Sequence, residues 1–144
     1  TPPELLEALG PFDLDPCAPT NRPWPTAKHH YTIQDNGLVQ PWHGRVWCNP
    51  PYGKKAAAWL AKCSVHQNAI ALIFARTETN MFFDFVWNTA TGLLFIKGRL
   101  YFHHVTGKRA RANSGAPSVL IAYNEQNYQA LANSGIAGKL VRLR

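Results

Sequence analysis

Short apolar runs recur along the chain and are separated by segments rich in proline, glycine or polar residues. Runs without an interior polar residue are typical of strands buried on both faces of a sheet. Runs that alternate with polar residues or stop at a proline indicate shorter or half-buried strands. Together these patterns predict strands at residues 12–15, 46–48, 69–74, 93–96, 119–123 and 139–143.

Segments with helical character lie between most of these runs. Residues 54–61 are rich in alanine, residues 80–86 are mostly apolar, and residues 125–133 separate two predicted strands. At the amino end, Thr1 is predicted to cap a helix that starts with two prolines and ends at Gly10. The alternation of strands and helices predicts an α/β fold.

The sheet is expected to be abbreviated near its amino-terminal strand. About twenty residues separate Asp15 from Asp35, and they are rich in proline, tryptophan and histidine without any periodicity. A full connection through a helix to a further parallel strand needs a longer segment. We therefore predict no complete helix-and-strand unit here.

The predicted strand at residues 46–48 ends in Asn49-Pro50-Pro51-Tyr52. Neither proline has an N–H for a sheet ladder, so strand pairing stops at Asn49 and the loop is held nearly rigid. A helix is predicted to follow, and α/β proteins bind ligands at such carboxyl ends of strands. For these four residues taken alone, a proline-stiffened surface turn is the alternative.

The charge of the chain indicates a polyanionic partner. The 144 residues have a formal net charge of +7 and a sequence pI near 9.6. A basic domain binds nucleic acid because it releases counterions from phosphates, and a surface that is basic only for solubility is the alternative. The residues that we expect to contact nucleic acid are Lys54, Lys55, Arg76, Arg99, Lys108, Arg109 and Arg111.

Cysteine and histidine usage argues against a metal centre. The three cysteines are widely spaced and include no Cys-x-x-Cys pair, so neither a disulfide framework nor a thiolate zinc site is predicted. Side chains of neighbouring histidines usually diverge, which makes His29-His30 and His103-His104 poor metal ligands. No apolar run of membrane-spanning length is present, and no secretory leader is recognised, so we expect one unsecreted domain.

Several short motifs follow one another in an order typical of one enzyme family. They are Thr-Pro at residues 1–2, Phe-Asp-Leu-Asp-Pro-Cys-Ala at 12–18, Asp-Asn-Gly-Leu at 35–38, Trp-x-Asn-Pro-Pro-Tyr-Gly at 47–53, Ala-Arg-Thr at 75–77, Gly-Arg-Leu-x-Phe at 98–102 and Ala-Pro-Ser at 116–118. With these motifs the chain resembles the phage-type DNA N6-adenine methyltransferases, the phage Dam family of class I S-adenosylmethionine-dependent enzymes. The resemblance covers nearly the whole chain.

The resemblance implies a fold as well as an activity. It implies a single methyltransferase domain over residues 1–144 without a separate target-recognition domain. The expected architecture is an abbreviated class I methyltransferase (Rossmann-like) mixed sheet, with helices on both faces and a reversed terminal strand pair. Target reading would then come from loops, chiefly residues 103–117.

The resemblance also implies S-adenosylmethionine as the cofactor and no metal. Asp15 would hold the ammonium group of this cofactor, and Asp35 would bond the exocyclic amine of its adenine. Ala18 and Pro19 stand where the family often has glycines. The implied cofactor-binding residues are Thr1, Pro2, Asp15, Pro16, Cys17, Ala18, Asp35, Asn36 and Asn49.

The implied catalytic residues are Asn49, Pro50, Pro51 and Tyr52. An adenine amine is a poor nucleophile because its lone pair is delocalised into the ring. The Asn49 side-chain oxygen and the Pro50 carbonyl would accept its two N–H bonds as positive charge develops. Tyr52 would stack on the base, which has to leave the duplex to be reached.

The implied partner is DNA with a flipped adenine, with no membrane and no obligate protein partner. The implied location is the cytoplasm of a bacterial host cell, for a phage- or prophage-encoded enzyme. Two alternatives stay open. One is methyl transfer to RNA or to a protein glutamine, and the other is a non-catalytic nucleic-acid-binding module with the same fold.

Overall fold

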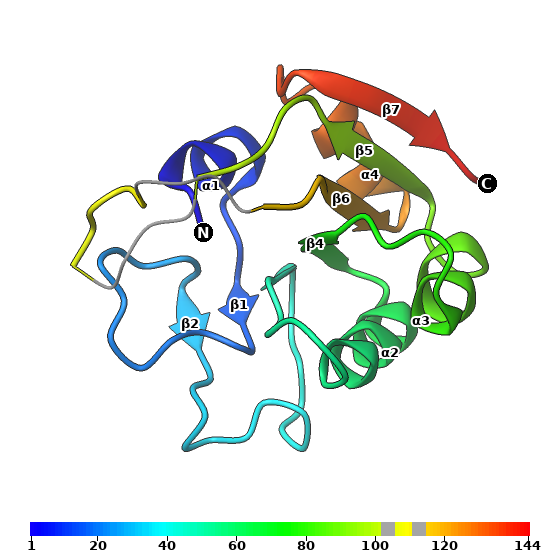
Figure 1. Ribbon diagram of the computed structural model, residues 1–144. Coiled ribbons are helices and arrows are strands. Elements are labelled where there is room, and N and C mark those ends of the chain that lie inside the picture. Colours follow the sequence, from blue (N-terminus) through cyan, green and yellow to red (C-terminus); the bar gives the residue numbers. More distant parts are fainter. Residues whose placement is uncertain (102–105, 111–114) are drawn as a thin grey trace.

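The computed structural model describes residues 1–101, 106–110 and 115–144. The chain contains both helices and strands, and helices separate most of the strands in its second half (Figure 1). In chain order the elements are α1 (Pro3–Leu9), β1 (Leu14–Asp15), β2 (His29–His30), β3 (Val46–Cys48), α2 (Ala56–His66), β4 (Ala69–Phe74), α3 (Asn80–Phe82), the π-helix η1 (Phe83–Trp87), β5 (Gly92–Ile96), β6 (Ser118–Tyr123), α4 (Glu125–Ala132) and β7 (Gly138–Arg142).

The strands form one seven-stranded mixed sheet in the order β2-β1-β3-β4-β6-β5-β7. The first four neighbours, β2, β1, β3 and β4, are parallel. Strand β6 is antiparallel to both β4 and β5, and β7 is antiparallel to β5. The last two strands of the chain therefore run against the parallel strands. The prediction of a mixed α/β sheet is confirmed.

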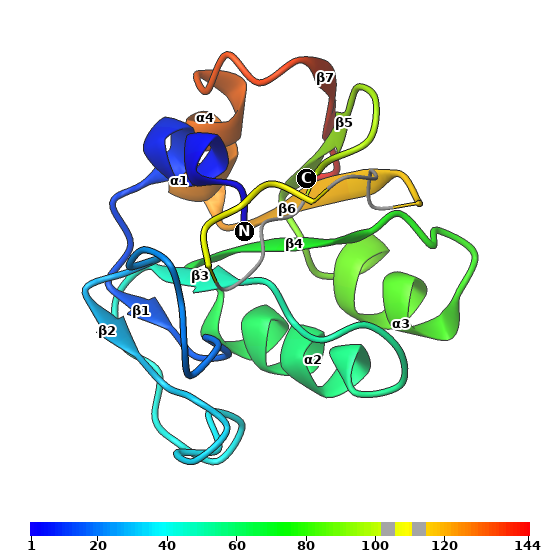
Figure 2. The same cartoon turned by 60° about the vertical axis from the view of Figure 1, so that its left-hand side comes forward.

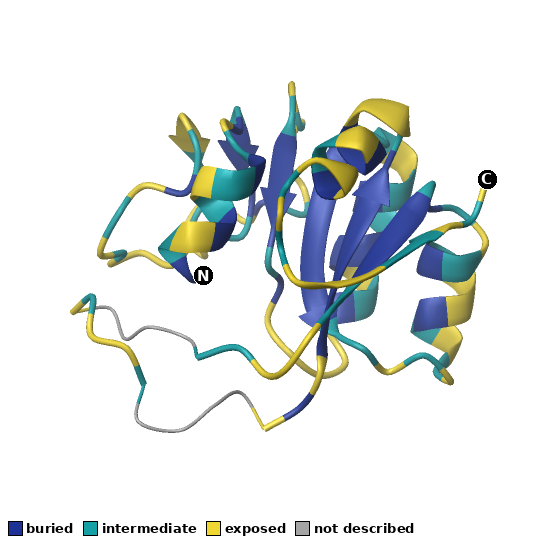
Figure 3. Cartoon of the chain, turned by 90° about the horizontal axis from the view of Figure 1, so that it is seen from above, coloured by how far each residue is buried: buried dark blue, intermediate teal, exposed yellow. Residues whose placement is uncertain are grey.

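The apolar runs of the sequence become the central strands because both faces of the sheet are covered. Figure 2 shows α1 and α4 on one face and α2 and α3 on the other. Along β4, Ile70 and Leu72 join the core beneath α1 and α4, whereas Ala71 and Ile73 join the core beneath α2 and α3. This alternation follows from the two-residue period of a strand. Burial of the central strands is evident in Figure 3.

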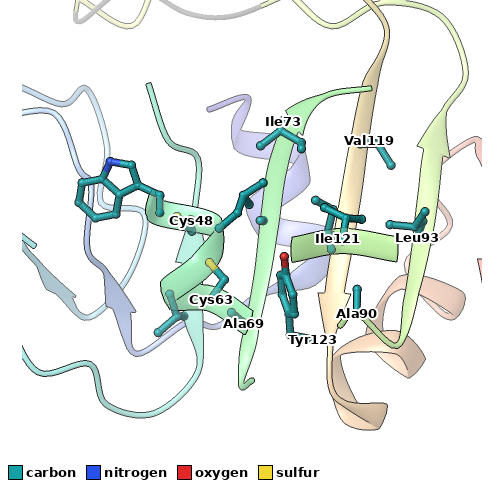
Figure 4. Close-up of a cluster of buried hydrophobic side chains, with 14 of the residues drawn as sticks. Cys48, Cys63, Ala69, Ile73, Ala90, Leu93, Val119, Ile121 and Tyr123 are labelled. Carbon is teal, nitrogen blue, oxygen red and sulfur yellow. The ribbon is translucent and has the colours of Figure 1, made fainter. Parts of the chain in front are cut away.

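The core between the sheet and α2 contains several small side chains. Figure 4 shows Cys48 and Cys63 beside Ala69 in this cluster, with Tyr123 nearby. All four side chains are fully buried. The Tyr123 hydroxyl donates to the main-chain carbonyl of Phe85 at 2.5 Å, so the one polar atom of this ring is satisfied inside the core.

Two local predictions differ from the structure, and one short strand was not predicted. Helix α2 begins at Ala56, so Lys54 and Lys55 precede it and do not occupy its first turn. Helix α1 is capped by Pro2 without a side-chain hydrogen bond, so Thr1 is not the helix cap. The segment after β1 contains no helix, as predicted, but it does contain the short strand β2.

One edge of the sheet, which we call the carboxyl edge, collects most of the loops. The parallel strands β1, β2, β3 and β4 all end there. Strand β5 runs in the same direction because both β4 and β5 are antiparallel to β6, so β5 ends at this edge and β6 begins there. The loops that follow strands at this edge are residues 16–28, 31–45, 49–55 and 75–79, together with the described residues 97–101, 106–110 and 115–117 after β5. No helix among the described residues is long and apolar enough to cross a bilayer.

Candidate active site

The loop Asn49-Pro50-Pro51-Tyr52 leaves the buried strand β3 at the carboxyl edge, as predicted. Pro50 is buried, whereas Pro51 and Tyr52 are exposed. Gly53 follows with φ +96°, a conformation that residues with a side chain rarely adopt, and this lets the chain turn into α2. The loop is thus anchored by Pro50 and open at Tyr52.

The carboxamide of Asn49 is oriented by the hydroxyl of Thr1. Asn49 Nδ2 donates to Thr1 Oγ1 at 3.2 Å, and Trp47 Nε1 donates to the same oxygen at 3.3 Å. Because its NH₂ group is engaged, the amide presents Oδ1 as its remaining polar atom. This role of Thr1 replaces the capping role that we predicted for it. Pro2 lies next to it and is buried.

Cys17 joins the loop after β1 to the loop after β3. Its thiol donates to the main-chain carbonyl of Asn49, with a distance of 3.2 Å between Sγ and O. The neighbouring thiol of Cys48 and burial raise the pKa of Cys17 well above its ordinary value. The thiol therefore stays protonated and remains a donor at neutral pH.

Asp15 ends β1 as a buried carboxylate with an exposed fraction of only 3%. Its Oδ1 accepts the backbone N–H of Cys17 at 3.1 Å, and its Oδ2 accepts the hydroxyl of Thr26. Burial raises the pKa of Asp15 to about 6, although these two hydrogen bonds act in the opposite direction. No ion pair among the described residues involves Asp15. The Thr1 ammonium and Arg22 also lower the pKa of Asp15, but to a smaller extent. A buried carboxylate that is not in an ion pair is suited to bind a cationic group.

The turn that contains Asp35 packs onto the loop that contains Asp15. Gly37 is buried, and a Cβ on it would lie 2.0 Å from the Pro16 carbonyl oxygen, so only glycine fits. Asn36 before it is exposed and has φ +55°. Lys62 holds the turn from α2 by donating to the carbonyls of Leu38 and Gln40, the former at 2.9 Å.

The carboxylate of Asp35 is itself exposed at the rim of this arrangement. Its Oδ2 accepts the backbone N–H of Thr32 at 2.8 Å and the Thr32 hydroxyl at 3.3 Å. Ala18 is buried on the other side of the same junction and donates its N–H to the carbonyl of Tyr31 at 3.0 Å. Packing and hydrogen bonds therefore join the loop that contains Asp15 and Ala18 to the turn that contains Asp35.

Tyr52 forms an aromatic pair that the sequence does not predict. Its ring stacks on Phe74 at the end of β4, with 3.9 Å between ring centroids and 6° between ring planes. Burial raises the pKa of Tyr52 to about 12, so its hydroxyl is neutral. Phe74 belongs to an apolar run that otherwise fills the core, which is why its sequence context indicated only packing.

Most of the predicted basic residues are exposed at the carboxyl edge. Lys54 and Lys55 follow the loop Asn49-Pro50-Pro51-Tyr52, and Arg76 follows β4. In the loop between β5 and β6, the Arg109 guanidinium lies 4.0 Å from the centroid of the Tyr101 ring. The remaining predicted contacts of this loop are Arg99, whose Nη1 donates to the Gly115 carbonyl at 2.9 Å, and Lys108, which is exposed.

This basic loop reaches the segment between β1 and β2. A Cβ on Gly107 would lie 3.5 Å from a side-chain atom of Pro23 and 3.7 Å from one of Trp24. Gly107 thus lies beside the segment that connects β1 to β2. Arg111, His103 and His104 lie outside the described residues. Within residues 1–101, 106–110 and 115–144, no group of three or more His, Cys, Asp or Glu residues could hold a metal ion.

Fold and site together define an α/β protein with acidic, amide and aromatic groups at one edge of its sheet and cations beside them. The family model of DNA N-6-adenine-methyltransferases (Dam) matches residues 1–137. The chain belongs to this family and is therefore an enzyme that methylates the N6 position of adenine in DNA. No curated protein and no solved structure matches it.

Proposed function

We propose that methyl transfer takes place at Asn49-Pro50-Pro51-Tyr52, with S-adenosylmethionine as donor and a flipped adenine as acceptor. The observation that supports this site best is the convergence of two loops on Asn49. Thr1 contacts its side chain and Cys17 contacts its carbonyl, at 3.2 Å each. A cofactor held at Asp15 would then lie next to the acceptor atoms. The proposed architecture is the abbreviated class I methyltransferase, or Rossmann-like, variant of the mixed sheet.

The residues at the carboxyl edge fit S-adenosylmethionine by their chemistry. This cofactor supplies a methyl group on a cationic sulfur. Asp15 offers a buried carboxylate that is in no ion pair among the described residues for the ammonium group, and Asp35 offers an exposed carboxylate for an exocyclic amine. The residues between them that complete the proposed cofactor site are Thr1, Pro2, Pro16, Cys17, Ala18, Asn36 and Asn49.

Asn49 and Pro50 activate the adenine amine in this proposal. Asn49 Oδ1 accepts one N–H of the amine while its own NH₂ group donates to Thr1. The main-chain carbonyl of Pro50 accepts the other N–H, and the adjacent Pro51 fixes the direction of that carbonyl. Both acceptors stabilise the positive charge that develops on nitrogen. Placement of the amine in line with the methyl group contributes much of the remaining rate.

Tyr52 provides the stacking surface for the extruded base. The ring is 47% exposed and its hydroxyl is neutral, so it offers a flat surface without charge. Cations at the carboxyl edge would neutralise the phosphates of the same strand. The proposed phosphate contacts are Lys54, Lys55, Arg76, Arg99, Lys108, Arg109 and Arg111.

The resemblance to phage-type enzymes supports action on DNA in the cytoplasm of a bacterial host. It also supports a site-specific reaction whose target is read by loops of this chain without an obligate protein partner.

A labelled methyl group provides the test of donor and acceptor. The protein is incubated with S-adenosylmethionine labelled in its methyl group and with duplex DNA, single-stranded DNA, RNA and a protein mixture in separate reactions. We expect label only in DNA, recovered as N6-methyladenine after digestion. In parallel, 2-aminopurine at the target position should fluoresce more strongly when the protein binds, because an unstacked base is less quenched. Label in RNA or protein glutamine, or unchanged fluorescence, would contradict the proposal.

A further inference from the structure

A cavity of about 570 Å³ opens between the catalytic loop, the end of β4 and α3. Its volume lies within the range of about 300–1,000 Å³ that is usual for small-ligand sites. Its walls are largely apolar and include Ala57 of α2, Phe74 of β4 and Met81 of α3. Of the proposed catalytic residues, only Tyr52 lines it.

The lining of this cavity does not include the two proposed acceptors of the reacting adenine. The amine of that base has to reach Asn49 Oδ1 and the Pro50 carbonyl, and neither residue lines the cavity. Asp15, the proposed ligand of the cofactor ammonium, does not line it either. The cavity begins at Tyr52 and continues towards α3. A group bound in it would therefore be a neighbour of the reacting base.

The walls of the cavity suit a nucleobase. The rings of Tyr52 and Phe74 are parallel within 6° and stacked at 3.9 Å, so each covers one face of the other. Because the other face of Tyr52 is assigned to the target adenine, a base in the cavity would stack on the face of Phe74 that Tyr52 does not cover. Bases of any identity stack on such rings. The hydroxyl of Thr79 in the lining is already engaged, because it donates to the Arg76 carbonyl at 2.9 Å and accepts the N–H of Phe82 at 3.2 Å. Binding would thus depend on stacking and shape.

Two cations give the cavity the charge that a nucleotide needs. Lys54 and Arg76 are exposed and belong to its lining. They come from different loops, after β3 and after β4, and each can contact a phosphate of the DNA strand. The cavity is also continuous with the proposed methylation site through Tyr52. Complementary charge and this continuity identify the DNA strand as its occupant.

We propose that the cavity seats the nucleotide next to the target adenine on the same strand, held by stacking and by phosphate contacts. This inference rests on the proposed function, because it takes Asn49 as the place of the reacting base. The enzyme would then remove a second base from the stack beside the one that it methylates. The flanking nucleotide would be held largely irrespective of its identity.

A variant that fills the cavity tests this inference. In Ala57→Phe a ring enters the cavity from α2, whereas Ala58→Phe adds the same ring at an exposed neighbouring position that does not line the cavity. The methylated sequence is first identified by treating a random-sequence DNA pool with the wild-type enzyme. The substrate is then a synthetic duplex that contains this sequence. Matched duplexes carry an abasic nucleotide directly 5′ or directly 3′ of the target adenine.

We expect Ala57→Phe to raise KM for the intact duplex by about tenfold or more, which is the size of a lost base-stacking contact. Its affinity for S-adenosylmethionine should stay at the wild-type value, and Ala58→Phe should behave like the wild type. One of the two abasic duplexes should restore KM for Ala57→Phe, because a nucleotide without a base no longer meets the new ring. If Ala57→Phe does not fold, Met81→Trp takes its place under the same criteria.

Two results would overturn the inference. A wild-type KM for the intact duplex in the filled variant would mean that no part of the DNA enters the cavity. A raised KM that neither abasic duplex restores would mean that a neighbouring base is not the occupant. Failure of the proposed function has a different signature. Asn49→Ala leaves the cavity lining intact, and methyl transfer that survives this substitution would contradict the proposed function.

Discussion

The thiol of Cys17 and the main-chain carbonyl of Asn49 are joined by a hydrogen bond of 3.2 Å. Cys17 lies in the loop after β1, two residues beyond the buried carboxylate of Asp15, and Asn49 begins the loop after β3. The two strands are neighbours in the sheet. This bond therefore links the proposed cofactor loop to the proposed catalytic loop.

Two substitutions of Cys17 should show whether kcat depends on its hydrogen-bond donor. Cys17→Ser keeps a donor and should retain most of the wild-type kcat. Cys17→Ala removes the donor and should lower kcat by about 3- to 10-fold, which is the usual contribution of one neutral hydrogen bond. Steady-state methyl transfer at saturating DNA and cofactor measures this difference.

Cys63→Ala serves as the control for the loss of a thiol. Cys63 is fully buried in α2 and has no hydrogen bond to Asn49 among the described residues. The variant Cys63→Ala should lower the free energy of unfolding but leave kcat of the folded enzyme unchanged. Equal kcat values for Cys17→Ser and Cys17→Ala would show that the link has no role in positioning Asn49.

Asp15→Asn should stabilise the protein without cofactor at neutral pH and abolish cofactor binding. Burial raises the pKa of Asp15 to about 6 from an ordinary value of 3.8, so the folded state holds this proton more tightly than the unfolded chain. The resulting stabilisation is complete below the ordinary value and is lost as the pH rises through 6. Its size is about 3 kcal/mol.

Urea unfolding of wild type and Asp15→Asn between pH 3.5 and 7 measures this effect, with calorimetry for S-adenosylmethionine at pH 7.5. The unfolding free energy of the wild type, relative to the variant, should fall over this pH range. Taking the difference removes the contribution of all other titrating groups that the substitution leaves unchanged. A difference that does not vary with pH would mean that Asp15 titrates normally in the folded state.

Asp35→Ala should weaken S-adenosylmethionine binding by about 3- to 10-fold, because the carboxylate is exposed and one hydrogen bond is lost. Asp84→Ala is the matched control, since Asp84 is an exposed aspartate on η1, away from the loop after β2. Calorimetry on the two variants provides the measurement. Unchanged affinity in Asp35→Ala would place the cofactor adenine elsewhere.

Removal of the basic side chains at Lys108, Arg109 and Arg111 should weaken DNA binding across all sequences. The triple Ala variant should lower the slope of log affinity against log salt by up to about three units, because each phosphate contact releases close to one counterion. Cofactor affinity should not change.

Lys139→Ala provides the comparison, because Lys139 is an exposed basic residue on the edge strand β7. It should leave the salt slope unchanged. An unchanged slope in the triple variant would mean that the loop charges serve solubility, and the phosphate contacts would then be assigned to Lys54, Lys55 and Arg76.

The central strands could be predicted because burial on both faces leaves an unbroken apolar run. This holds for β4 and β6, which are neighbours over their whole length. The short strand β2 gave no such signal. Its two residues are histidines. Backbone bonds pair it with β1, among them His29 N–H to the Asp13 carbonyl and Tyr31 N–H to the Asp15 carbonyl, at 3.0 and 2.9 Å.

The loop at residues 49–52 could likewise be predicted, because two prolines end a strand wherever they occur. The long-range partners of the proposed site residues could not be predicted. Thr26 bonds Asp15 from a segment without periodicity, Thr1 bonds Asn49 although its sequence context indicated a helix cap, and Phe74 stacks on Tyr52 although it ends an apolar run. Each of these contacts depends on how strands are ordered in the sheet, and local sequence does not contain that order.

Methyl transfer by Asn49→Ala tests the central claim most directly. The measurement is kcat for transfer of labelled methyl to duplex DNA, together with the dissociation constant for S-adenosylmethionine and the unfolding midpoint. Loss of one preorganised acceptor should lower kcat by about 100- to 1,000-fold, by analogy with a lost oxyanion-hole donor. Fold and cofactor affinity should remain close to wild type. A variant that keeps more than about a tenth of the wild-type kcat would contradict the assignment of Asn49 as the acceptor for the adenine amine.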